Sequence, residues 1–141
     1  MTRRDTGRAM SQENVETVRV LWAGLERGDV RLDLCDEEIE LRTAAEIPVA
    51  DEYRGHTGVR QWVTDVWEVF NGFHNEVEEI LEAGGGDTIV TVVRTSGRMR
   101  HTGLEAKVKW AVVWSFQRGK VVRAHGYLSK AEALEAAGLR E

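Results

Sequence analysis

The sequence predicts an α+β domain in which helices cover one face of a curved antiparallel sheet, and three patterns indicate it. Apolar residues recur at helical spacing over residues 15–25 and 59–70. From residue 74 onward, polar and apolar residues alternate as they do in strands. Glycine-containing breaks separate these strands and are typical of hairpins. Because helices and strands do not alternate along the chain, the order favours this class over a parallel sheet with crossover helices.

The first helix is expected to follow a polar extension. Residues 1–10 are rich in arginine and have no apolar period, so we predict that they are disordered and place a single domain over residues 11–141. Ser11 is suited to cap the helix, and Gly28 is suited to end it.

The middle of the chain predicts a turn, a strand, a loop and a second helix. A short helical turn is expected over residues 29–35, and a strand with two different faces over 38–43. Residues 44–56 contain the only proline and are predicted to form a loop. The second helix has one broad apolar stripe and is predicted to end before Gly72. The stripe consists of Val59, Trp62, Val63, Val66, Trp67 and Phe70.

The second half of the chain predicts two hairpins and a closing helix. The four strands are expected at residues 77–83, 88–95, 105–117 and 120–127. Ser129 and Glu132 have the spacing of a capping box, in which each side chain can bond the free backbone N–H near the other. The last helix is therefore predicted to begin at Ser129 and to end at Gly138.

The strand over 105–117 has two apolar faces. Trp110, Val112 and Trp114 share one face, while Ala111 and Val113 lie on the other. An antiparallel strand with one face in solvent does not need apolar residues on that face. We therefore predict that the second face meets a partner subunit.

Composition excludes several classes of protein. The chain has 141 residues, of which 42% are hydrophobic and 30% charged, as in a globular domain. No apolar run has the length of a membrane-spanning helix, and the first residues have no apolar signal core. A single cysteine, Cys35, and scattered histidines do not make a zinc site. We expect a cytoplasmic protein with no metal and no cofactor, and no membrane as a partner.

The charges are unevenly distributed. Acidic residues dominate from Glu26 to Asp87, and basic residues dominate from Arg94 to Arg123. A basic stretch is compatible with nucleic-acid binding, but no aromatic residues interleave with it to stack on bases. Pairing between an acidic strand and a basic strand explains the same pattern without a ligand. We expect no nucleic acid as a partner.

Four short segments together carry a family resemblance that covers residues 11–139. The segments are 11–15 with Gly28-Asp29, 53–56 with 58–60, 119–122, and 131–139. In this order they resemble the SnoaL-like branch of the nuclear-transport-factor-2-like superfamily, which includes polyketide cyclases and ketosteroid isomerases and has a cystatin-like fold. The resemblance implies a cone in which helices cover the concave side of a curved antiparallel sheet and enclose a pocket. It also implies a homodimer through the convex side.

The catalytic groups of the known branches do not match this chain. In the ketosteroid-isomerase branch, the base would fall at Leu41 or Arg42 and the hydrogen-bond donors at Leu21 and Val112, which cannot do this work. The histidine and aspartate of the cyclase branch would fall at Val112 and Gly126. The epoxide-hydrolase branch has an Arg-x-Asp pair where this chain has Arg98-Met99-Arg100.

The resemblance instead implies an apolar, aromatic-rich pocket, although tryptophans that simply fill the cone would give the same pattern. Candidate pocket residues are Leu21, Trp22, Tyr53, Val63, Trp67, Arg98, Trp110, Val112 and Trp114. Tyr53 is considered as a lid and Arg98 as a polar group within the pocket. The remaining candidates for catalysis are Glu40 as a base, Arg42 as its support, and His125, although the family's strand phase favours the convex side for His125.

Two functions remain open from the sequence. The first is a small-molecule-binding domain in a homodimer, with a hydrophobic ligand and without the family's catalytic groups. The second is a cofactor-independent lyase, isomerase or hydrolase that acts on a hydrophobic metabolite. Fold alone does not decide between them.

Overall fold

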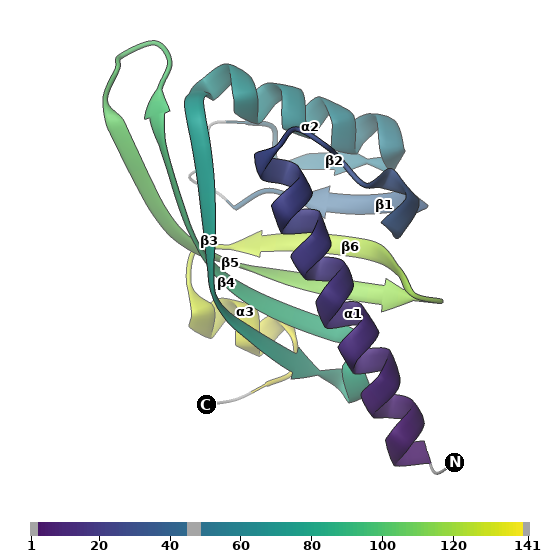
Figure 1. Cartoon of the computed structure of the whole chain (residues 1–141). Coiled ribbons are helices and arrows are strands. Elements are labelled where there is room, and N and C mark those ends of the chain that lie inside the picture. The colour runs from purple at the N-terminus through teal and green to yellow at the C-terminus, as the bar shows by residue number, and fades with distance from the viewer. Residues whose placement is uncertain (1–2, 45–48, 140–141) are drawn as a thin grey trace.

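The computed structural model describes residues 3–44 and 49–139, which form one six-stranded sheet with helices on both faces (Figure 1). The helices are α1 (Arg3–Glu26), α2 (Gly55–Val69) and α3 (Lys130–Ala136), with 3-10 turns η1 (Leu32–Leu34) and η2 (Gly84–Gly86). The strands are β1 (Cys35–Arg42), β2 (Glu52–Arg54), β3 (Phe70–Ala83), β4 (Thr88–Met99), β5 (Glu105–Gln117) and β6 (Lys120–Tyr127). The predicted α+β class is confirmed.

The sheet is mixed rather than wholly antiparallel. Its strand order is β2-β1-β6-β5-β4-β3, and β1 runs parallel to β6 while every other described pair is antiparallel. The predicted all-antiparallel sheet is wrong at this pair. Polarity patterns identify strands, but they do not specify the relative direction of two strands that lie far apart in the chain. In addition, β2 lies inside the segment that was predicted to be a loop. A strand of three residues is too short to show an alternating pattern, so the sequence did not reveal it.

Two predicted helix boundaries differ from the structure. Helix α1 begins at Arg3, upstream of the expected cap at Ser11, so it includes most of the segment that we expected to be disordered. Helix α2 ends at Val69, and Phe70, which completed the predicted apolar stripe, is the first residue of β3. Gly72, the expected helix stop, lies at an irregularity in β3 where the pairing with β4 shifts.

Helix α1 lies across the concave face of the sheet (Figure 1). On the side of α1 that faces the sheet, Val18 is completely buried and Trp22 is 6% exposed. Nearer its start, the Asn14 Nδ2 atom donates a hydrogen bond of 2.7 Å to the carbonyl oxygen of Gly86 in η2. These contacts attach the helix to the turn between β3 and β4 and to the centre of the sheet.

Helix α3 covers part of the convex face and accounts for the second apolar face of β5. Ala133 and Leu134 of α3 are buried in one cluster with Val92, Ala111 and Val113. The interpretation that Ala111 and Val113 need a partner subunit is therefore wrong, because α3 of the same chain supplies the cover. The sequence predicted this helix, but it did not show on which side of the sheet it packs.

The Ser129 half of the predicted capping box is observed at the start of α3, and an ion pair joins the helix to the sheet. The Ser129 Oγ atom accepts a hydrogen bond of 3.1 Å from the backbone N–H of Glu132. The Lys130 Nζ atom lies 2.9 Å from Glu79 Oε1 on β3. The helix is thus anchored at its first turn.

The acidic and basic segments meet across the strands. The Glu78 carboxylate on β3 lies 3.3 Å from the Arg94 guanidinium on β4 and 3.6 Å from the Lys109 ammonium group on β5. These ion pairs connect three neighbouring strands. This pairing explains the charge asymmetry without a nucleic-acid ligand. In the described part of the chain, none of the helices combines the length and the apolar character needed to cross a bilayer.

We predict that Leu134→Ala lowers the free energy of unfolding by about 2–5 kcal/mol, because it leaves a cavity under α3. Chemical denaturation followed by circular dichroism measures the change. Glu135→Ala, on the exposed side of the same helix, is the matched control and should change stability by less than about 0.5 kcal/mol. Equal effects of the two substitutions would contradict the packing described for α3.

Candidate functional site

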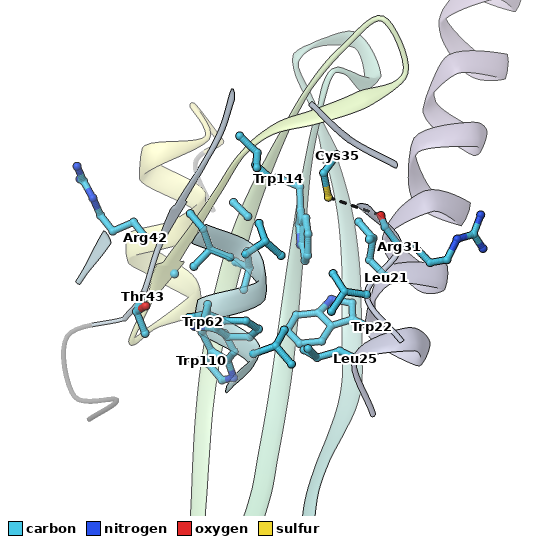
Figure 2. A pocket seen from close by; sticks show the side chains of 18 residues that line it. Leu21, Trp22, Leu25, Arg31, Cys35, Arg42, Thr43, Trp62, Trp110 and Trp114 are labelled. Carbon is cyan, nitrogen blue, oxygen red and sulfur yellow. Dashed lines mark hydrogen bonds between the residues drawn. The ribbon is translucent and has the colours of Figure 1, made fainter. Parts of the chain in front are cut away.

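A cavity of about 80 Å³ lies between α1, α2 and the concave face of the sheet (Figure 2). Its wall is almost entirely aromatic and aliphatic. The principal contributors are Leu21, Trp22 and Leu25 from α1; Val59, Trp62 and Val63 from α2; Ile39 and Leu41 from β1; and Trp110, Val112 and Trp114 from β5. The helices and the sheet therefore enclose a space that their side chains do not fill completely.

Three tryptophans set the shape of the wall. Trp22 meets Trp110 and Trp114 edge to face, with ring centroids 5.9 Å and 5.7 Å apart. The indole N–H groups of Trp110 and Trp114 donate to the hydroxyl groups of Thr95 and Thr91 on β4, at 2.8 Å and 2.9 Å. Both strand tryptophans are thus held by a bond as well as by packing.

The absence of a side chain at Gly126 leaves room for the Trp110 ring. A Cβ atom on Gly126 would lie 3.0 Å from the Trp110 Cζ3 atom and 2.9 Å from the backbone nitrogen of Ala44. Residue 126 also borders the cavity. Only a residue without a side chain lets the ring and the chain after β1 approach β6 so closely.

Six of the nine predicted pocket residues line this cavity. They are Leu21, Trp22, Val63, Trp110, Val112 and Trp114. Among the lining residues that sequence reasoning did not choose, Trp62 belongs to the predicted apolar stripe of α2, so the helical period could have found it. Cys35 and Thr43 gave no such signal, because Cys35 is the first residue of β1 and Thr43 follows its last residue.

The structure places Tyr53, Trp67 and Arg98 outside the cavity. The Tyr53 hydroxyl is buried, donates a hydrogen bond of 2.6 Å to Asp65 Oδ2 and accepts one from the Ala50 backbone N–H. Burial, together with the Asp65 bond, raises the pKa of Tyr53 to about 12. Its contacts connect β2 to α2 and stabilise the fold there.

Trp67 and Arg98 have other contacts. Trp67 packs edge to face against Phe73 and borders an open groove with Arg27 and Arg100. The Arg98 guanidinium donates to the Gly103 carbonyl oxygen at 2.8 Å, in the exposed hairpin between β4 and β5. The prediction that Trp67 and Arg98 line the pocket is therefore wrong. Trp67 lies at the edge of the apolar stripe of α2, and Arg98 lies beyond the part of the sheet that the helices cover.

Glu40 and His125 face the convex side, away from the cavity. Because Ile39 and Leu41 line the cavity, the intervening Glu40 side chain points to the opposite face. Its Oε2 atom lies 3.1 Å from His125 Nε2, and its Oε1 atom lies 3.2 Å from the Arg54 guanidinium. The hypothesis that Glu40 points into the pocket was therefore wrong, whereas the convex position favoured for His125 agrees with the structure.

Arg42 borders the cavity, but its side chain points away from it, as does that of Arg31 (Figure 2). The Arg31 guanidinium instead pairs with Asp33 at 2.8 Å. Cys35, which also borders the cavity, has its pKa raised to about 11, chiefly by burial, so its thiol is protonated at neutral pH. Among the described residues, the cavity wall therefore contains no carboxylate, imidazole or thiolate that could move a proton.

The matched relatives share the fold. Bal32a from a soil-derived mobile gene cassette superposes with a TM-score of 0.76 at 20% identity, over 91% of this chain and 98% of that one. TerC, co-crystallised with polyporic acid, has a TM-score of 0.71 at 20% identity, over 89% and 97% of the two chains.

A third relative carries a much smaller ligand. The hypothetical protein with a ketosteroid isomerase-like fold from Catenulispora acidiphila, in complex with trimethylamine, has a TM-score of 0.69 at 15% identity, over 89% and 94% of the two chains. No functionally curated protein matches the chain. These likenesses show that the chain has the fold that the family resemblance predicted.

A family model also matches directly at the level of sequence. It describes the SnoaL-like domain and covers residues 7–124, which include every described strand except the end of β6. The chain therefore belongs to the family of SnoaL-like domains.

Proposed function

We propose that this chain is a small-molecule-binding domain whose interior cavity takes an apolar ligand without converting it. The main support for this proposal is the chemistry of the cavity wall. Aromatic and aliphatic side chains surround the space, and proton-transferring groups are lacking among the described residues that line it. A ligand there gains burial of its apolar surface, but it meets no acid or base.

Two structures with the same fold were crystallised with small molecules, which supports a small-molecule ligand for this chain. TerC was crystallised with polyporic acid, and the Catenulispora protein was crystallised with trimethylamine. The two compounds differ widely in size, so they do not indicate the size of a ligand for this chain.

We also propose that two copies associate through the part of the convex face that α3 leaves uncovered. Glu40 there lies near Arg54 and 3.8 Å from Arg123, and these two arginine side chains are 72% and 62% exposed. In a two-fold symmetric homodimer the same patch of both subunits must fit itself. A patch that holds both signs of charge can do so, because the acid of one copy can face the arginines of the other. Apolar residues under α3 do not contribute to this surface.

The alternative is an enzyme that uses Glu40 and His125. Their separation of 3.1 Å is that of a carboxylate–imidazole pair, which can hold and transfer a proton. Its substrate would have to bind on the convex face rather than in the cavity. Glu40→Gln separates the two functions, because it should abolish such turnover but leave the affinity of a cavity ligand unchanged.

Ligand binding is tested by native mass spectrometry of the purified protein and by a thermal-shift screen of small neutral compounds. We expect a bound compound at about a hundredfold its Kd to raise the Tm by about 5–10 °C. Ala124→Leu should abolish that rise, because residue 124 borders the cavity and the larger side chain fills it.

The control is Leu104→Phe, an exposed site in the distant hairpin, which should keep the full ligand-induced rise. A Tm rise that survives Ala124→Leu unchanged, in a variant with a cooperative melt, would place the ligand elsewhere and contradict the proposal.

The Glu40 contacts predict a pH-dependent stability. Side-chain hydrogen bonds with Glu52 and with His125, and the charge of Arg54, lower the pKa of Glu40. A lowered folded-state pKa stabilises the fold above the unfolded-state pKa, and this stabilisation is lost as the pH falls through the folded value. We expect Glu40→Gln to reduce stability at pH 7 by up to about 1 kcal/mol. Urea unfolding from pH 7 to pH 3 should show this difference shrinking in acid.

The homodimer is tested by light scattering. A mass near twice 15.9 kDa is expected for the native chain, and Arg123→Glu should shift it toward the monomer because it places like charges near Glu40. Arg60→Glu on the exposed side of α2 is the matched charge reversal and should leave the dimer intact. A monomeric native chain at micromolar concentration would refute the dimer.

A further inference from the structure

The open groove beside Trp67 is a second candidate site, separate from the interior cavity. It lies where the residues after α1, helix α2 and the start of the β4–β5 hairpin meet. Its volume is about 510 Å³, within the range of roughly 300–1,000 Å³ that is typical of small-molecule sites, whereas the cavity measures about 80 Å³. Val63 borders both spaces, and the other described residues of the two walls differ.

The Trp67 indole gives the groove a flat apolar surface. This half-buried ring packs edge to face against Phe73, with ring centroids 6.1 Å apart. Phe73 in turn stacks on Phe70, also at 6.1 Å, with an angle of 22° between the ring planes. The row of three rings holds the indole in place, and Val63 lies one turn before it on α2. An aromatic ligand can therefore bury apolar surface there against a preformed wall.

Two guanidinium groups border the same groove. The Arg100 Nη2 atom donates to the carbonyl oxygens of Trp67 and Phe70 at 2.8 Å and 3.1 Å, which holds this exposed side chain at the end of α2. Arg27 directly follows the last residue of α1 and is also exposed. Among the described residues, neither guanidinium pairs with a carboxylate. Both positive charges are therefore available to an anion, and arginine binds carboxylates well.

Glu68 limits the charge that the groove accepts. Its side chain borders the groove together with the two arginines, so the three groups have a net charge of one positive unit. A single carboxylate balances this charge, whereas a second one would be repelled by Glu68. The groove therefore matches a monoanion better than a dianion or a cation.

We infer that this groove binds an aromatic monocarboxylate, whose ring lies against Trp67 and whose carboxylate pairs with Arg27 and Arg100. The inference goes beyond the proposed cavity function, because the site has a different wall and its ligand class is set by charges that do not point into the cavity.

The test compares 1-naphthoate with its neutral analogue 1-naphthamide. Each is titrated into the full-length ¹⁵N-labelled protein, and NMR follows the indole N–H signal of Trp67, which is identified by its loss in Trp67→Phe. We expect naphthoate to bind about three- to tenfold more tightly than the amide, because only the carboxylate pairs with the arginines. This preference should shrink as the salt concentration rises.

Charge variants test the groups that set the preference. Arg27→Gln and Arg100→Gln should each weaken naphthoate binding by about two- to fivefold and leave naphthamide binding unchanged. Glu68→Gln should strengthen naphthoate binding by a similar factor, because it removes a repelling charge. Arg118→Gln, in the exposed turn between β5 and β6, is the matched control and should leave both affinities unchanged. Dispersed spectra establish that each variant is folded.

A further variant separates the groove from the cavity. Naphthoate binding should survive Ala124→Leu, which fills the cavity but does not border the groove. Loss of binding in this folded variant would place naphthoate in the cavity, overturning this inference while supporting the proposed function. Equal affinities for naphthoate and naphthamide would overturn the inference, as would a naphthoate preference that survives both Arg27→Gln and Arg100→Gln. An unshifted Trp67 signal at millimolar naphthoate would overturn it as well.

Discussion

The contact of Trp22 with Trp110 and Trp114 connects the first helix to the middle of the sheet, and the enclosed space depends on it. The sheet curves around α1, and its pairing shifts in β1, β3 and between β5 and β6. The Trp22 indole plane makes angles of 86° and 80° with the Trp110 and Trp114 ring planes, so Trp22 does not stack flat on either ring. These three large side chains form one wall of the small cavity beside them. Threonine hydroxyl groups on β4 hold the two strand tryptophans in this arrangement.

The two faces of the sheet have different chemical character. The concave face holds the apolar cavity, and the convex face holds α3 and the paired charges of Glu40, Arg54 and His125. This division follows from alternation along the strands, since each residue between two cavity-lining ones points to the other side. The groups that could transfer protons are therefore kept apart from the enclosed space by the thickness of the sheet. The cavity and the charge-paired residues therefore lie on separate surfaces of the sheet.

Much of this arrangement could be predicted from the sequence, and the failures have identifiable causes. The apolar periods located α2 and the long strands, and the spacing from Ser129 to Glu132 located the start of α3. The strand phase implied by the family resemblance also selected the part of the cavity wall that β5 contributes, because Trp110, Val112 and Trp114 share one face. Phase could not place Arg98 beyond the covered sheet, nor show that β1 runs parallel to β6, since both depend on contacts distant in sequence. The position of α3 was missed for the same reason, and a partner subunit was assumed where the chain covers itself.

The close packing around Gly126 restricts how this cavity can change over evolution. Residue 126 corresponds, by the family resemblance, to the aspartate of the cyclases, so an acidic side chain there would give the cavity the proton-transferring group that it lacks. A first carbon atom at this position would already meet the Trp110 ring and the backbone of Ala44 at about 3 Å. An aspartate at this position would therefore require both the Trp110 ring and the backbone at Ala44 to move, so replacing Trp110 alone would not make room for it. Acid–base chemistry at residue 126 thus needs a change in the path of the chain after β1 as well as a smaller side chain at residue 110.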